Sequence, residues 1–206
     1  MKLLGLACAW IAYALLHSAL AALPVKAWAE RRWPGAVRYY RLSYNVFAVI
    51  ALLPILWLSY GIDGGWLWRW TGAAAWLANG VALAAVVGFL ASARHYDMDA
   101  FLGLRQLREA ASTADGSEVF ALSPFHRYVR HPWYFFGLVL IWTRDMNAAT
   151  LVSALAITFY FVLGSKIEER KLVASHGDIY RRYMACVPGL VPLPWKFLTA
   201  EEARKL

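Results

Sequence analysis

Long runs of apolar residues without a charged side chain are the main pattern in this sequence. Three of them cover residues 3–23, 42–60 and 72–93. An α-helix rises about 1.5 Å per residue, so each run is long enough to cross the roughly 30 Å hydrocarbon core of a bilayer. The pattern therefore predicts three transmembrane helices.

A fourth apolar region, residues 133–165, is interrupted by the polar tetrapeptide 144–147 (Arg-Asp-Met-Asn). A charged residue at the bilayer centre costs roughly 2.5–3.5 kcal/mol, so we expect a turn there that joins two helices at the far interface. The first helix, about 132–143, is short for a span: it is tilted, buried among other helices, or extended backwards through 125–129. The expected fold is an all-α, polytopic membrane bundle of about five transmembrane helices, in one domain covering residues 1–206.

The C-terminal part is expected to continue as helix outside the membrane. The fifth helix extends through residues 166–176, where Gly177 supplies a C-cap and Asp178 an N-cap for a further short helix. Tyr180 and Tyr183 are three residues apart and so share one face of that helix. We predict a C-terminal cytoplasmic helix.

Composition and charge agree with a membrane protein and give its orientation. Apolar residues make up 61% of the chain and charged residues 17%, against about 45–50% and 25% in soluble domains, which excludes a lone soluble enzyme.

Of the 21 Lys and Arg residues, 18 lie in 24–41, in 94–131 or from residue 166 onward. The positive-inside rule makes these segments cytoplasmic and the N-terminus extracytoplasmic. The net charge of +8 thus indicates topology, and no nucleic-acid partner is expected. The alternative, a cleaved signal peptide in residues 1–23, would turn the five cations of 24–41 outward.

Few residues in the predicted spans are polar. His17, Asn45 and Asn79 are functional candidates because lipid offers them no hydrogen-bond partner, but ordinary bonds between helices explain them equally well. Cys8 and Cys186 form neither a disulfide framework nor a metal-binding pair, so no metal is expected.

A basic and aromatic segment precedes the fourth apolar region. Pro132 stands where a helix begins, so backbone N–H groups are directed into the junction, and Arg127, Arg130 and His131 add donors and positive charge. Gly137 allows close approach of backbone or ligand. This combination predicts a site for an anion; a simple positive-inside anchor is the alternative for the two arginines.

The acidic pair Glu168 and Glu169 follows the fifth apolar helix. Adjacent helical residues project about 100° apart, so one carboxylate can face a pocket while the other pairs elsewhere. Acidic groups are disfavoured at a helix C-terminus, which suggests a cationic partner, although a solvated helix end is the usual explanation.

Taken together, four ordered segments within residues 125–194 resemble the C-terminal signature of the isoprenylcysteine carboxyl methyltransferase and phospholipid methyltransferase superfamily: Arg130-His131-Pro132-x-Tyr134-x-x-Gly137, Glu168-Glu169-Arg170-x-Leu172, Gly177-x-x-Tyr180-x-x-Tyr183 and Val187-Pro188. The usual spacing puts glycine two residues after the tyrosine, whereas two phenylalanines intervene here. Three earlier patterns are similar to the nurim-like and methanethiol S-methyltransferase branch: Leu16-His17-Ser18, Arg38-Tyr39-Tyr40-Arg41-Leu42-x-Tyr44-Asn45 and Tyr96-Asp97-x-x-x-Phe101-x-Gly103-Leu104-x-Gln106.

The resemblance implies S-adenosylmethionine as the cofactor, in a pocket facing the cytoplasm. The residues implied in binding are His131, Pro132, Tyr134, Gly137, Glu168, Glu169, Tyr180 and Tyr183. His131 and the backbone after Pro132 would hold the carboxylate or ribose side, and one glutamate the ammonium. Tyr134 would line the pocket, and Tyr180 and Tyr183 would close over the adenosine.

The expected function is methyl transfer to a small thiol or lipophilic acceptor in the bilayer. For a thiol, nearby cations lower the pKa of the sulfur, and Arg41 and Arg130 are the candidates, with His17 as base. Two alternatives stay open: a nurim-like membrane protein without catalysis, and an NADPH-dependent enzyme resembling sterol reductases.

Overall fold

The computed structural model describes residues 1–62, 64–109 and 122–204. These residues are mainly helical. The α-helices are α1 (Lys2–Ala21), α2 (Leu23–Arg32), α3 (Tyr40–Tyr60), α4 (Gly72–Ala93), α5 (Met98–Leu102), α6 (Leu104–Glu109), α7 (Pro132–Trp142), α8 (Ala148–Cys186) and α9 (Ala200–Arg204). The other elements are the 3-10 helices η1 (Pro34–Tyr39) and η2 (Pro124–Arg127) and the paired strands β1 (Trp66–Trp68) and β2 (Met146–Asn147).

Contacts between Cα atoms divide the described residues into two compact units. Unit 1 comprises residues 1–62, 64–67, 96–109 and 146–156. Unit 2 comprises residues 68–95, 122–145 and 157–204. Each unit is described separately below.

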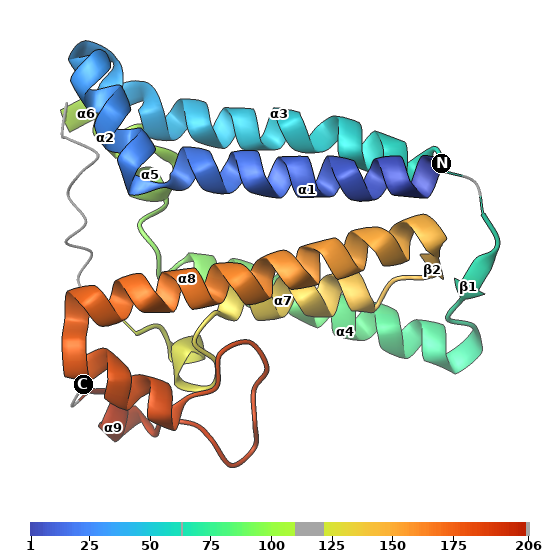
Figure 1. Cartoon of the computed structure of the whole chain (residues 1–206). Coiled ribbons are helices and arrows are strands. Elements are labelled where there is room, and N and C mark those ends of the chain that lie inside the picture. The colour runs from blue at the N-terminus through green and yellow to red at the C-terminus, as the bar shows by residue number, and fades with distance from the viewer. Residues whose placement is uncertain (63, 110–121, 205–206) are drawn as a thin grey trace. The chain divides into compact units, whose positions relative to one another are not determined.

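In unit 1, α1 and α3 lie side by side (Figure 1), with α2 and η1 between them in the chain. The hydroxyl of Tyr40 donates to the carbonyl of Leu20 over 2.7 Å. Asn45 donates its amide to the carbonyls of Phe101 and Leu102 at the end of α5. Its polar side chain therefore caps a neighbouring helix.

Gly103 explains how α5 packs against α3. Its φ of +90° is in the left-handed region that favours glycine. A Cβ atom at this position would lie 2.6 Å from the backbone nitrogen of Leu42. No other residue fits there without displacing the chain.

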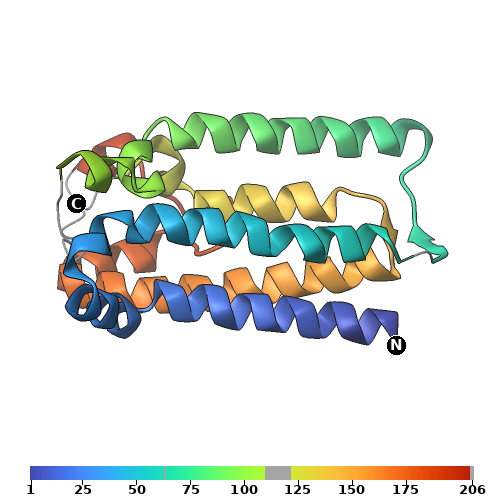
Figure 2. The same cartoon turned by 90° about the horizontal axis from the view of Figure 1, so that it is seen from above.

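Unit 2 contains α4, α7 and the larger part of α8, with α7 between the other two helices (Figure 2). Helices α4 and α7 approach closely because Gly88 lacks a side chain: a Cβ there would lie 2.5 Å from Cε1 of Phe136. At the other end of this pair, Arg144 donates to Oδ1 of Asn79 over 3.2 Å. Asn79, the polar residue of the third apolar run, thus bonds the turn that follows α7.

The apolar pattern predicted the long helices well. The run 72–93 coincides with α4, and α1 and α3 begin and end within two residues of the runs 3–23 and 42–60. Among the residues that the structure describes, four helical segments are long and apolar enough to cross a membrane: Lys2–Ala21, Pro34–Tyr60, Gly72–Ala93 and Ala148–Cys186. The chain is an all-α integral membrane protein.

Helix α7 has 11 residues and is about 16 Å long, which is too short to cross the hydrocarbon core. It does not extend backwards, because residues 124–127 form the separate 3-10 helix η2. The polar tetrapeptide 144–147 forms the turn and strand β2 that lead into α8. The Ala-, Ser-, Thr-, Asp- and Gly-rich stretch 110–117, whose composition predicts a flexible cytoplasmic loop, lies outside the described residues.

Helix α8 changes direction at Gly177, whose φ of +58° and ψ of −130° are not helical (Figure 1). The following segment packs on the rest of unit 2 through Tyr180, Tyr183 and Val187, which form a buried cluster with Leu198. The predicted cap therefore lies at the predicted residue, and the bend turns the tyrosine face of this short helix inward.

Candidate active site

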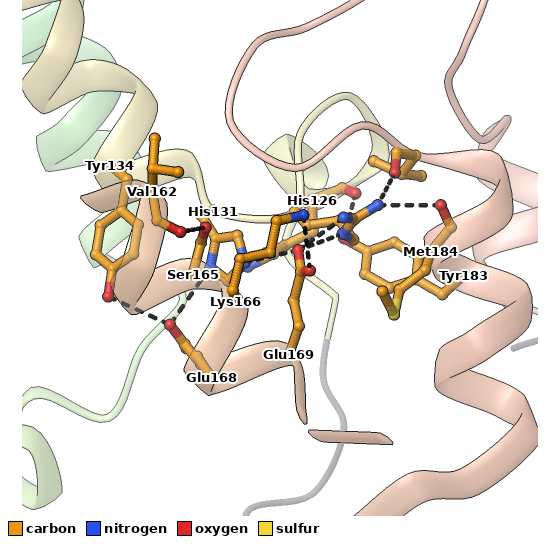
Figure 3. A network of polar contacts seen from close by, with 12 residues as sticks. His126, His131, Tyr134, Val162, Ser165, Lys166, Glu168, Glu169, Tyr183 and Met184 are labelled. Carbon is orange, nitrogen blue, oxygen red and sulfur yellow. Dashed lines mark hydrogen bonds and ion pairs between the residues drawn. The ribbon is translucent and has the colours of Figure 1, made fainter. Parts of the chain in front are cut away.

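The two adjacent glutamates of α8 have opposite environments. The side chain of Glu169 is 4% exposed, whereas that of Glu168 is 49% exposed. The two side chains extend in different directions from α8 (Figure 3), as the helical angle between neighbours requires. One carboxylate is therefore buried in the protein and the other is accessible.

Glu169 is neutralised by Arg130, whose side chain is 7% exposed. Its Oε1 accepts from Nε of Arg130 over 2.9 Å and from Nη2 over 2.7 Å. Nη1 of Arg130 donates to the carbonyls of Met184 and Val187. The Arg130 guanidinium thus joins the segment before α7 to the middle of α8 and to the end of α8. Glu169 and Met184, two of its partners, are labelled in Figure 3.

His131 lies between the two glutamates. It is the N-cap of α7, and its backbone N–H donates to the carbonyl of Gly189 over 3.1 Å. Nε2 of its ring is 3.2 Å from Oε1 of Glu169, and Nδ1 is 3.4 Å from Oε2 of Glu168. The buried ring is therefore the link between the neutralised carboxylate and the accessible one.

Tyr134 holds the accessible carboxylate from the other side. Its hydroxyl donates to Oε2 of Glu168 over 3.3 Å. The phenol ring stacks on His131, with ring centres 5.3 Å apart, and on Phe161, with centres 4.6 Å apart. Three parallel rings thus line the face from which Glu168 extends.

Gly137 makes room for this stack. A Cβ on Gly137 would lie 3.1 Å from Cε2 of Phe161, closer than side chains ordinarily pack. Sequence reasoning missed Phe161, which is one of many apolar residues in its span. Phe161 precedes Glu168 by seven residues, or two helical turns, so the two residues share one face of α8. This spacing could have identified Phe161 from the sequence.

Pro132 is buried in the first turn of α7, and Tyr180 and Tyr183 are each 1% exposed. The hydroxyl of Tyr183 donates to the carbonyl of His126 over 2.7 Å. Both tyrosine rings lie in the interior of unit 2. Their role in closing over the adenosine stays a prediction.

Sequence reasoning also missed His126. Its Nδ1 accepts from the backbone N–H of Ser123 over 3.1 Å, while the N–H of His126 bonds Ser123 in return, so the two residues form a capping box at η2. Burial, together with the nearby His131, lowers the pKa of His126 to about 4. Nδ1 can accept this hydrogen bond only while it carries no proton, and the lowered pKa keeps the ring unprotonated at neutral pH.

The two remaining predicted residues, His17 and Arg41, lie in unit 1. Nε2 of His17 is 2.8 Å from the hydroxyl of Tyr44, which links α1 and α3. Arg41 is in the first turn of α3, where Gly103 packs on its backbone. The structure thus brings nine of the eleven predicted site residues into unit 2.

The site offers an accessible carboxylate, a row of rings and a buried, neutralised ion pair behind them. Such a surface attracts an organic cation with a polar or aromatic part. Within the described residues, no group of three or more His, Cys, Asp or Glu side chains could hold a metal ion.

No family model matches this sequence. No solved structure matches it either. Known proteins do. The methanethiol S-methyltransferase of Crocosphaera subtropica is 32% identical over 188 residues, which cover 87% of this chain and 71% of the relative. Methanethiol S-methyltransferase 2 of Bradyrhizobium diazoefficiens is 33% identical over 182 residues (87% and 69%), and the methanethiol S-methyltransferase of Mycobacterium tuberculosis is 31% identical over 196 residues (88% and 75%). The chain belongs to the methanethiol S-methyltransferase family.

Proposed function

We propose that this protein transfers a methyl group from S-adenosylmethionine to the sulfur of a small thiol in or at the membrane. Methanethiol is the first candidate acceptor, since it is the thiol in the names of the relatives. Neither alternative, a protein without catalysis or an NADPH-dependent reductase, is favoured by this relationship.

The accessible carboxylate of Glu168 is the observation that carries the proposal. The donor has an ammonium group, a positively charged sulfur, an adenine ring and a carboxylate. Glu168 fits the ammonium, and its position is fixed by the hydroxyl of Tyr134 and Nδ1 of His131. The arrangement favours Glu168 over Glu169, because Arg130 already neutralises the latter.

The other predicted site residues receive roles that match their burial. We assign Arg130 and Glu169 to positioning of the site, since every nitrogen of the guanidinium already bonds the protein. Tyr180 and Tyr183 support the same region from the interior. Pro132 sets the start of α7, and Gly137 permits the ring stack behind Tyr134.

When bound, S-adenosylmethionine supplies a methyl group on a good leaving group, so no covalent enzyme intermediate is needed. The protein contributes orientation and exclusion of water. A thiol reacts as thiolate, and its proton must reach a base. His17 remains the proposed base and Arg41 the proposed cation that lowers the pKa of the thiol.

We further propose that α7 is a fifth, shortened membrane segment packed among the other helices of unit 2, with the charged turn 144–147 at the far interface. The charge distribution then places the N-terminus outside and the C-terminus and the site in the cytoplasm. A reporter that is active only in the cytoplasm, fused after Leu206, should be active. An inactive reporter at normal expression would overturn this topology.

Titration of detergent-purified protein with S-adenosylmethionine, its demethylated product and NADPH tests the proposal. We expect both methyl-donor forms to bind and NADPH to be silent. Glu168→Gln should weaken donor binding about 10- to 100-fold, the usual value of a hydrogen bond to a charged group, without changing thermal stability. Glu169→Gln is the matched control and should instead lower the melting temperature.

If the parent protein binds neither S-adenosylmethionine nor its demethylated product, the proposed methyltransferase function is refuted. If binding is found, incubation with labelled donor and a panel of methanethiol, longer thiols, prenylcysteine and phosphatidylethanolamine identifies the acceptor. Transfer to phosphatidylethanolamine alone would exclude a thiol as the substrate.

A further inference from the structure

The segment between α8 and α9 forms a hairpin, residues 189–197, whose two ends are tied to the chain just before α7. At one end, the N–H groups of Arg130 and His131 donate to the carbonyls of Pro188 and Gly189 over 2.9 and 3.1 Å. At the other end, Leu198 and Arg127 exchange two hydrogen bonds of 2.9 Å. The base of the hairpin is therefore level with the point where the apolar helix α7 begins.

The tip of the hairpin is a tight turn. Leu193 and Lys196 form a bridge, with the N–H of Lys196 donating to the carbonyl of Leu193 over 3.1 Å. Pro194 and Trp195 lie between them, and Trp195 is 78% exposed. In Figure 1 the segment between α8 and α9 projects away from the helices. The largest apolar side chain of the hairpin is thus presented outward.

The exposed side of the hairpin, together with residues 127 and 128 at its base, combines apolar side chains with positive charge. Val191, Phe197 and Tyr128 are exposed, and the rings of Phe197 and Tyr128 stack with their centres 6.0 Å apart. The Arg127 guanidinium lies 5.5 Å from the Tyr128 ring centre, and Lys196 follows Trp195. Pro188 and Leu198, at the two ends of the hairpin, are buried, so the hairpin is fixed to the protein at its base and exposed at its tip.

We propose that this hairpin lies in the headgroup region of the bilayer that the same unit spans, with Trp195 inserted at the boundary of the acyl chains. Tryptophan and tyrosine prefer this interface, and basic residues are attracted to anionic lipids. The apolar helices α4 and α8 of unit 2 require a bilayer around them, and the hairpin base lies at the start of apolar α7. Lipid is therefore the partner already present at this level.

The contact has a consequence for the site. The carbonyls of residues 188 and 189 at the hairpin base bond the two residues, Arg130 and His131, that hold the glutamates. A hairpin fixed in the interface restrains these carbonyls. The proposed contact requires only that the chain spans a membrane. The test of the hairpin therefore does not decide whether the protein transfers methyl groups.

Fluorescent labelling in lipid nanodiscs tests the contact. In a chain with Cys8→Ser and Cys186→Ser, the variant Trp195→Cys is labelled with an environment-sensitive dye and quenched by headgroup spin-labelled lipid or by aqueous iodide. The matched controls are Lys171→Cys, an exposed residue of α8 beyond its apolar part, and Phe159→Cys in the apolar part. Val191→Cys is a second hairpin position in case Trp195→Cys fails to fold.

We expect headgroup-lipid quenching at the hairpin at least threefold stronger than at Lys171→Cys, and iodide quenching at most a third as strong. Quenching equal to that at Lys171→Cys would overturn the proposal, because the hairpin would then lie in water. Protection from both quenchers would overturn it as well, since it would indicate a protein partner.

Discussion

Units 1 and 2 use polar side chains in different ways. In unit 1, neutral groups make separate bonds between helices, such as His17 with Tyr44 and Asn45 with the end of α5. In unit 2, charged groups form one connected network, in which Arg130, Glu169 and His131 join segments up to 57 residues apart in the chain. Unit 1 also contains ion pairs, Arg105 with Asp97 and Arg108 with Asp99, but these side chains are exposed. The difference is therefore that the ionic network of unit 2 is buried and connected, whereas unit 1 holds separate bonds together with the proposed base His17 and the proposed cation Arg41.

The strongest test of this difference is to break the buried ion pair. Glu169→Ala leaves the Arg130 charge buried without its partner, which typically costs about 3–5 kcal/mol. We expect a clear fall in the thermal midpoint of the detergent-solubilised protein. The double variant Arg130→Met with Glu169→Leu should recover at least half of the loss, since it removes both charges. A single-variant loss below about 1 kcal/mol would contradict the importance of the network.

Close helix packing provides the second test. Gly88→Ala puts a methyl group against the Phe136 ring and should destabilise the protein by about 1–3 kcal/mol, the usual cost of overpacking. Gly80→Ala in the same helix is the matched control, because nothing lies within 4 Å of its Cβ. Equilibrium unfolding in mixed micelles should separate the two variants. Equal behaviour would mean that the α4 and α7 pair does not depend on this approach.

A pH dependence follows from His126. Its pKa is about 4 in the folded protein against 6.5 in an unfolded chain, so the unfolded state binds more protons between these values. The free energy of unfolding should therefore fall as the pH is lowered from about 6.5 toward 4, by at most ~1.4 kcal/mol per pH unit.

The variant His126→Gln isolates this contribution. Glutamine at this position keeps the capping box but does not titrate. The difference in thermal midpoint between the parent and the variant should change across pH 4–6.5 and stay constant above pH 7. A constant difference throughout would exclude His126 as the titrating group.

The smallest expected effect is in unit 1. Tyr44→Phe removes one half-buried hydrogen bond to His17, which is worth about 0.5–1.5 kcal/mol. If His17 is the base, His17→Ala should lower kcat much more than Tyr44→Phe does, at similar stability. Equal kcat values for both variants and the parent would confine this pair to a structural role and sharpen the contrast with unit 2.

The sequence predicted several elements closely because their causes are local. Charge-free apolar length predicted α1, α3 and α4, and Gly177 predicted the bend in α8. The site was predicted only as a set of residues. Glu168 and Glu169 are equivalent in the sequence, and the difference in their burial depends on Arg130, which precedes them by almost 40 residues.

The sequence by itself determined the membrane class, the ends of the long helices and the family, because hydrophobic length, caps and ordered motifs are properties of neighbouring residues. Only the tertiary structure decided which carboxylate is accessible, why Gly137 lacks a side chain, and that Tyr180 and Tyr183 are interior residues. These features depend on which distant segments meet, and burial and ion pairing arise only when they do. That is also why Phe161 and His126 became visible as parts of the site only in the folded chain.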